Sequence, residues 1–138
     1  QRRHLVDAGK VNGYILASYS ARRLGLASTG NAGGYHNILV PANMNHCDNL
    51  ITQMNRGLWI TDLLGHGVNA MTGDFSCGAN GFWIENGEIQ YPVHEITIAS
   101  NLMEMFAGIE AVASDIDPGS SIHCGSLLIQ KMTVAGQH

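Results

Sequence analysis

The sequence predicts an α+β fold made mainly of antiparallel β-sheet, with two or three short helices. The first supporting observation is a hairpin, in which apolar Phe82–Ile84 is followed by Glu85-Asn86-Gly87-Glu88 and then by alternating apolar and polar residues. Asn-Gly is the preferred central pair of a type I′ turn, because both central residues need a positive φ. The second observation is the segment Asn101–Val112, whose apolar residues recur at helical spacing.

The other predicted strands are short and apolar, and glycine, asparagine or proline residues near their ends favour turns. They are expected at Tyr14–Tyr19, His36–Val40, Leu58–Leu64, Leu127–Ile129 and Met132–Val134. The second arm of the hairpin is expected to run from Ile89 to Val93 and to continue through Ile96–Ala99.

Two further segments favour helix. Ser20–Leu24 has good helix formers after a serine that can cap them. Cys47–Arg56 has one apolar helical face, with Asn45 or Asp48 as a candidate N-cap and Gly57 as a candidate C-terminal glycine.

The helix at Asn101–Val112 has recognisable signals at both ends. Asn101 and Glu104 form a capping-box pattern with Asn in place of Ser. Gly108 costs about 1 kcal/mol in a helix interior, so the helix can end near Ala107.

Length and composition predict one ordered domain over residues 1–138. Charged residues make up 13% of the chain, about half the usual fraction, so part of the surface is expected to meet a partner or another domain. The chain begins Gln-Arg-Arg-His without a methionine, and it is therefore expected either to be a piece of a longer protein or to lack its first residues.

Charge and hydropathy argue against several functional classes. The net charge is −4 and no basic run exceeds two residues, so a nucleic-acid partner is not expected. No apolar stretch reaches the roughly 20 residues of a membrane span, and no signal peptide is recognisable. Cys47, Cys77 and Cys124 are odd in number and widely spaced, which predicts reduced thiols in a cytoplasmic protein.

Candidate metal ligands do not form a site by spacing alone. His94-Glu95 begins like the zinc-protease pattern HExxH, but Ile98 stands where the second histidine is needed. The pairs His46-Cys47 and His123-Cys124 could each direct one ligand at most towards a given metal, because adjacent strand residues point to opposite faces. A small buried thiol is the other interpretation of Cys124. No catalytic residue is predicted.

An ordered set of sequence blocks resembles the TldD/PmbA family, and specifically its PmbA (TldE) branch. The set covers nearly the whole chain and corresponds to about the C-terminal third of a typical member. The blocks are Ser18–Leu26, Ser28–Gly34, Gly65–Asn69, Thr72–Ser76, Gly81–Ile89, Tyr91–Val93, Glu95–Ala99, Asn101–Leu102 and Met132–Gly136.

The resemblance implies a cytosolic zinc metallopeptidase system, in which TldD-type and PmbA-type subunits pair and cleave extended or unfolded peptides. In the TldD type, an upstream HExxxH helix supplies zinc ligands and the general base, and a cysteine followed by glycine supplies another ligand. Cys124-Gly125 falls at that position, so the resemblance implies Cys124 as a metal ligand. Zinc is expected in the intact complex but not on this chain alone, which lacks a complete catalytic site.

The same resemblance implies that this part of the protein shapes the peptide chamber and the subunit interface. Sheet edges and glycine loops would guide an extended peptide, and the expected contact residues are Gly33, Gly34, Gly81, Phe82 and Trp83. The expected partner is a TldD-like subunit or a second copy of the chain. Two alternatives stay open: a non-catalytic binding or assembly module, and a catalytic zinc subunit with Cys124 as a ligand.

Four positions depart from the usual pattern of the resembled family. Arginine is usual where Cys77 stands, alanine where Asn80 stands, and glycine at Ser100 and Ala113. These departures leave open which substrate contacts form near Cys77.

Overall fold

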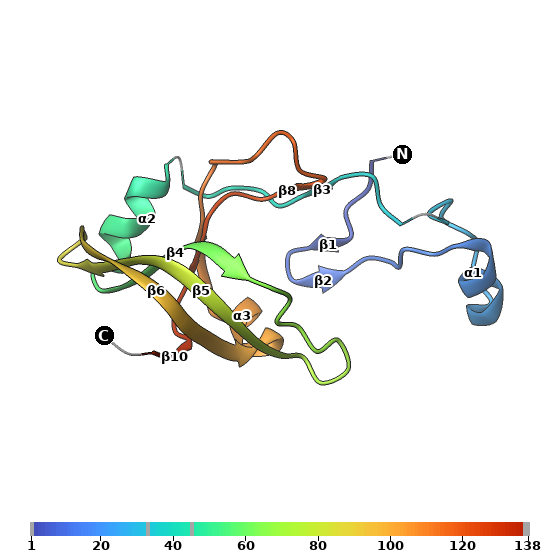
Figure 1. Ribbon diagram of the computed structural model, residues 1–138. Coiled ribbons are helices and arrows are strands. Elements are labelled where there is room, and N and C mark those ends of the chain that lie inside the picture. Colours follow the sequence, from blue (N-terminus) through green and yellow to red (C-terminus); the bar gives the residue numbers. More distant parts are fainter. Residues whose placement is uncertain (1, 33, 45, 137–138) are drawn as a thin grey trace. The chain divides into compact units, whose positions relative to one another are not determined.

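A computed structural model of the chain describes residues 2–32, 34–44 and 46–136. The chain divides into two compact units, Gln1–Ile38 and Leu39–His138. Antiparallel strands dominate and three short helices accompany them, so the predicted α+β class is confirmed (Figure 1). A single domain over residues 1–138 stays a prediction.

The first unit holds a small hairpin and one helix. Strands β1 (Val6–Asp7) and β2 (Lys10–Val11) pair across a turn at Ala8-Gly9, where both residues have positive φ. Helix α1 (Ser18–Leu24) follows, so the strand predicted at Tyr14–Tyr19 is wrong. The Ser20 hydroxyl donates to the Ala17 carbonyl at 3.1 Å, so Ser20 lies in the first helical turn and is not its cap.

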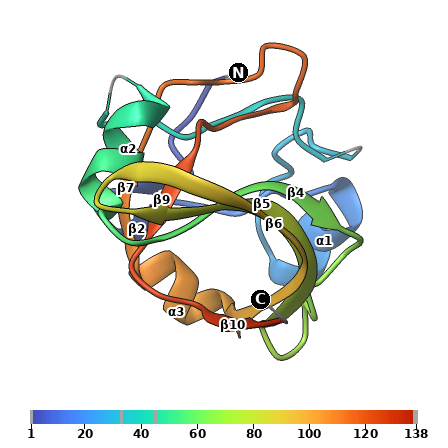
Figure 2. The same cartoon turned by 60° about the vertical axis from the view of Figure 1, so that its left-hand side comes forward.

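The second unit is built around a four-stranded antiparallel sheet in the order β10-β6-β5-β4. Its strands are β4 (Gly57–Leu64), β5 (Asp74–Glu85), β6 (Glu88–Asn101) and β10 (Thr133–Ala135). The long strands β5 and β6 run side by side and bend along their length (Figure 2). Asn86 and Gly87 join them with φ values of 56° and 73°, which confirms the predicted turn.

Two β-bulges flank Asn80 of β5. On one side, His94 and Glu95 of β6 both lie opposite Asn80, and the Glu95 N–H donates to its Oδ1 at 2.9 Å. Glu95 has a positive φ of 51°. On the other side, Thr61 is the extra residue of β4. Bulges increase the local twist of a strand pair, so the sheet is most distorted here.

Helix α2 (Cys47–Met54) confirms the predicted helix but not its ends. The residue that caps the C-terminus of the helix is Asn55, whose φ is 58°. Gly57, the predicted C-terminal glycine, instead begins β4. Asp48 lies in the first turn, and the residue before the helix is His46. The other candidate cap, Asn45, lies outside the described residues.

Helix α3 (Leu102–Ala107) has the predicted N-cap. The Asn101 side chain accepts the Met103 N–H at 3.0 Å. The helix ends at Ala107, as Gly108 suggested, and does not continue to Val112. The apolar residues that continue the helical spacing instead form strand β7, which pairs with β9.

The remaining strands form two short ladders. Strand β7 (Ile109–Val112) pairs with β9 (Leu127–Ile129), as predicted for the latter segment. Strand β3 (Ile38–Leu39) pairs with β8 (Ile122–His123).

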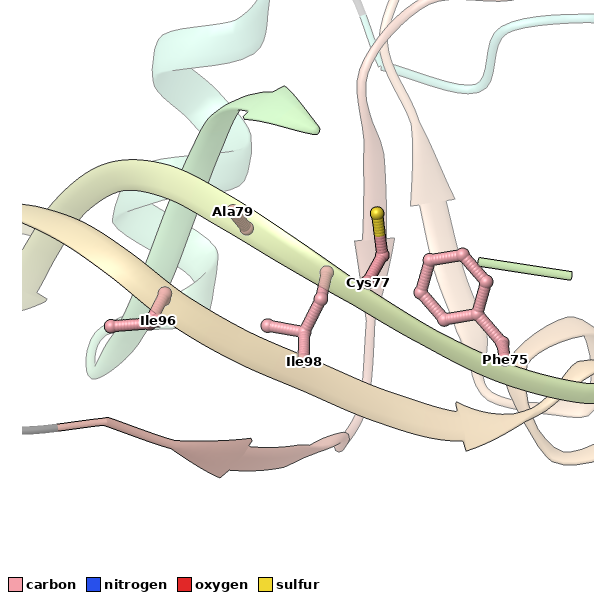
Figure 3. Packing of buried hydrophobic residues seen from close by; sticks show 5 residues of the cluster. All are labelled: Phe75, Cys77, Ala79, Ile96 and Ile98. Carbon is pink, nitrogen blue, oxygen red and sulfur yellow. The ribbon is translucent and has the colours of Figure 1, made fainter. Parts of the chain in front are cut away.

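Two separate apolar clusters form the core of the second unit. The first lies on β5 and β6 and consists of Phe75, Cys77, Ala79, Ile96 and Ile98 (Figure 3). The second joins α2 to β7, β9 and the residue after β7, and consists of Leu50, Ala111, Ala113 and Leu128.

Candidate functional site

A cavity of about 620 Å³ is bounded by residues of both core clusters of the second unit. Strand β4 lines it from Gly57 to Leu63, and the segment Ser126–Met132 also lines it. Helix α2 contributes Leu50, Ile51 and Met54. A volume of this size lies within the roughly 300–1,000 Å³ of typical ligand sites.

The cavity wall is mainly apolar, and an arginine and a tryptophan line it near the start of β4. Leu58 and Ile60 of β4 pack against the first core cluster. The indole of Trp83 also lines the cavity, and the Arg56 guanidinium carbon lies 5.6 Å from its ring centroid. A cation over an indole face is attracted by the ring quadrupole, which favours one placement of the guanidinium.

Strand β4 is an edge strand. Within the described residues it pairs with β5, and it ends the strand order of the sheet. An edge strand presents a row of backbone N–H and C=O groups that another extended chain can pair with. Because the cavity is lined by β4, the geometry suits an extended chain whose side chains enter an apolar space.

The hairpin residues predicted to contact peptide lie on β5, one strand behind this edge. Trp83 lines the cavity. Phe82 instead stacks on Trp59 of β4, with ring centroids 5.7 Å apart and ring planes at 36°. At Gly81 a Cβ atom would lie 2.9 Å from the Cα of Ile60 and still closer to the Trp59 carbonyl oxygen, so glycine permits the close pairing of β4 and β5.

The predicted glycine loop lies in the first unit. The Gly34 N–H donates to the Asn31 carbonyl at 3.0 Å, and the Asn31 side-chain amide donates to the Gly34 carbonyl at 3.1 Å. These bonds close a tight turn in which Gly34 has a φ of 92°. Gly33 lies outside the described residues. Peptide contact by either glycine stays a prediction.

Cys124 lies just after β8 and is partly buried. Its thiol donates to the Gly125 carbonyl at 3.3 Å, and burial followed by the charge of Asp115 raises its pKa. Among the described residues, no group of three or more His, Cys, Asp and Glu side chains could hold a metal ion. These residues therefore do not fit a zinc site by themselves, and the ligand role of Cys124 stays a prediction.

Asp115, in the segment that follows β7, is hydrogen-bonded to Ser126, the residue just before β9. Its carboxylate accepts the Ser126 hydroxyl at 2.6 Å and the Ser126 N–H at 2.8 Å. Burial alone would raise the pKa of Asp115, but these hydrogen bonds and one from its own backbone together lower it below the ordinary value of 3.8.

The lowered pKa of Asp115 predicts an acid-sensitive contribution to folding. A carboxyl group with a depressed folded-state pKa stabilises the protein above its ordinary pKa, and this stabilisation is lost as pH falls through the lowered value. As pH is lowered from pH 4, we expect the free energy of unfolding to fall less for Asp115→Asn than for the native protein. Urea unfolding at each pH measures this difference.

Asp74 provides the internal reference for that experiment. Its pKa is also lowered, by hydrogen bonds from Thr72 and then from Asn101. The variant should therefore keep some acid sensitivity. An unchanged pH profile in Asp115→Asn would contradict the role given to the Ser126 hydrogen bonds.

Sequence reasoning missed Arg56, Trp59, Asp62 and Lys131. One sequence signal could have indicated Arg56 and Lys131: they are the only two Lys or Arg residues after residue 38. No local pattern indicated that β4 is an edge strand, since strand order depends on pairing between distant segments.

Comparisons with known proteins agree with the fold. The family model described as "PmbA/TldA metallopeptidase C-terminal domain" matches residues 1–136. The chain is 50% identical over 137 residues to Metalloprotease PmbA of Escherichia coli O157:H7, and 51% identical over 137 residues to a Metalloprotease PmbA homolog of Haemophilus influenzae. Each alignment covers 99% of this chain and 30% of the relative, so the chain spans about a third of the length of these proteins.

Two crystal structures have the same fold, and both proteins are described as proposed modulators of DNA gyrase. The structure from Bacteroides thetaiotaomicron has a TM-score of 0.89 at 31% identity, over 99% of this chain and 31% of its own. The one from Thermotoga maritima has a TM-score of 0.85 at 31% identity, over 95% of this chain and 32% of its own. Within the described residues, no helix is long and apolar enough to span a membrane. The chain belongs to the family of PmbA/TldA metallopeptidase C-terminal domains and is of the PmbA type.

Proposed function

We propose that this chain is the C-terminal part of a PmbA-like subunit in a cytoplasmic zinc metallopeptidase complex that cleaves extended peptides. Its task in that complex is to shape the peptide chamber and to bind the peptide. One observation carries the proposal: the edge strand β4 lines an apolar cavity of about 620 Å³. The three free cysteines suit a reducing compartment.

The peptide would bind as a strand added to β4. Main-chain hydrogen bonds to the strand edge give affinity for many sequences, and alternate side chains enter the apolar cavity beside Leu58, Ile60 and Leu128. The described residues do not make up a metal site, so we assign no chemical step to them. The partner we propose is a TldD-like subunit or a second copy of the chain.

A role in assembly alone is a second candidate. Several large apolar side chains outside the cavity lining are strongly exposed, including Met71 at 95%, Met103 at 78% and Phe106 at 66%. Exposed apolar surface of this kind suits contact with another protein surface.

Backbone methylation of a bound peptide distinguishes the two functions. If the peptide pairs with β4, N-methyl groups on the residues whose N–H groups face β4 should weaken binding to the intact protein by about tenfold or more. Methyl groups on the intervening residues should have a smaller effect, because successive N–H groups of a strand point in opposite directions. Isothermal titration calorimetry measures both series without a label.

The matched control is the same peptide without methyl groups. An effect with a period of two residues supports strand addition. Equal effects at every position would contradict it, and absence of binding by all extended peptides would favour the assembly role.

A further inference from the structure

The charges of the second unit are distributed unevenly around the cavity. From Leu39 onward, the sequence has only two Lys or Arg residues, Arg56 and Lys131, and both line the cavity. Of the ten Asp and Glu residues in the same unit, all within the described part of the chain, only Asp62 lines it. The carboxylates of this unit are Asp48, Asp62, Asp74, Glu85, Glu88, Glu95, Glu104, Glu110, Asp115 and Asp117.

This distribution suits an anionic ligand group. Cations gathered in a concave site of an otherwise acidic unit raise the local concentration of anions there. Arg56 is the better placed cation, because its guanidinium lies over the Trp83 ring while its side chain remains exposed. A guanidinium presents its N–H groups in a planar fork, which can bind a carboxylate in a bidentate manner.

The positions of the charges along β4 also match an extended peptide. Arg56 immediately precedes β4, and Asp62 lies six residues further on, beyond the bulge at Thr61, so the two residues are five regular strand steps or roughly 17 Å apart. A peptide antiparallel to β4 would have its C-terminus at the Arg56 end and its N-terminus at the Asp62 end. The signs of the two side chains are opposite to those of the two peptide termini.

We propose that the cavity recognises a peptide carboxylate at Arg56, with Lys131 as a second cation, and that a peptide of about six residues lies antiparallel to β4. The ligand class is thus a short extended peptide with a carboxylate at one end. This inference rests on the proposed peptide-binding function. The carboxylate is the α-carboxylate of the peptide or a terminal Asp or Glu side chain.

The test compares four forms of one apolar hexapeptide by calorimetry on the intact protein: free acid, C-terminal amide, amide with a terminal glutamate, and N-acetylated free acid. The free acid should bind at least about tenfold more tightly than the amide. Recovery of affinity by the glutamate amide would support carboxylate recognition and identify the side chain as a sufficient source. Equal binding of free acid and amide would overturn the inference while leaving strand addition intact, whereas no binding by any form would contradict the proposed function itself.

Variants locate the recognised groups. Arg56→Gln should remove most of the preference for free acid over amide, and Lys131→Gln should reduce it. Arg23→Gln, an exposed cation of α1 outside the cavity lining, should leave it unchanged. N-acetylation should weaken binding to the native protein but not to Asp62→Asn, and equal effects on both would overturn the antiparallel orientation. A preference that survives in both Arg56→Gln and Lys131→Gln would overturn the assignment of the cations.

Discussion

Replacing Gly81 by alanine is expected to destabilise the protein by about 3 kcal/mol. The new Cβ would lie 2.9 Å from both the Trp59 carbonyl carbon and the Ile60 Cα, and closer still to the Trp59 carbonyl oxygen. These are backbone atoms of a paired strand, so they cannot rotate away as a side chain can. Strand β4 would have to separate from β5, which would also disturb the proposed peptide-binding edge.

Two measurements report this change. Urea unfolding gives the loss of stability. Amide hydrogen exchange should accelerate, relative to the native protein, more in β4 than in the β5–β6 hairpin. Gly78→Ala is the matched control on the same strand, because its Cβ would meet only the side chain of Leu64, at 3.2 Å or more. Similar losses in the two variants would contradict a special close approach at Gly81.

Gly125→Ala is expected to cost a similar amount, about 3 kcal/mol. Its Cβ would lie 2.6 Å from the Ala113 carbonyl carbon, closer still to the carbonyl oxygen, and 2.7 Å from the Asp115 Oδ1. The Ala113 N–H donates to the Ser126 carbonyl at 2.9 Å, so the two segments cannot move apart without losing that bond and the Asp115 contacts.

The Gly125 prediction separates packing from metal binding. Because the clash is with protein atoms, the loss should persist in unfolding measurements made with a chelator present. Cys124→Ser should change the free energy of unfolding little when a chelator is present. If Cys124 is a metal ligand, this variant should contain less zinc than the native protein in the intact complex. Gly119→Ala is the control in the preceding turn, where the nearest atom is the Asp117 Oδ1 at 3.3 Å. Full recovery of Gly125→Ala stability with chelator would contradict the packing explanation.

Local chemistry explains which parts of the fold were predictable. The Asn86-Gly87 turn, the Asn101 cap and the helix end near Ala107 depend on the preferences of a few adjacent residues. The errors arose where distant pairing overrode those preferences. Ile109–Val112 continues a helical pattern but is paired with β9, and only tertiary contact favours that strand.

The candidate site was predictable only in part, for the same reason. The blocks from Ser18 to Gly136 resemble the family to which the chain belongs. However, among the predicted contact residues that the structure describes, only Trp83 lines the cavity. Arg56 and Lys131 are 75 positions apart in the chain, and no local pattern indicates that they share a site.

The amino-acid sequence alone thus determined the fold class, the central hairpin and the family. These depend on short-range backbone preferences and on the order of sequence blocks along the chain. Only the tertiary structure decided that β4 is an edge strand, that Gly81 and Gly125 lie against neighbouring backbone, and that both Lys and Arg residues of the second unit line one cavity. Each of these features requires distances between residues far apart in the chain, and such distances are set by strand pairing and packing rather than by local preference.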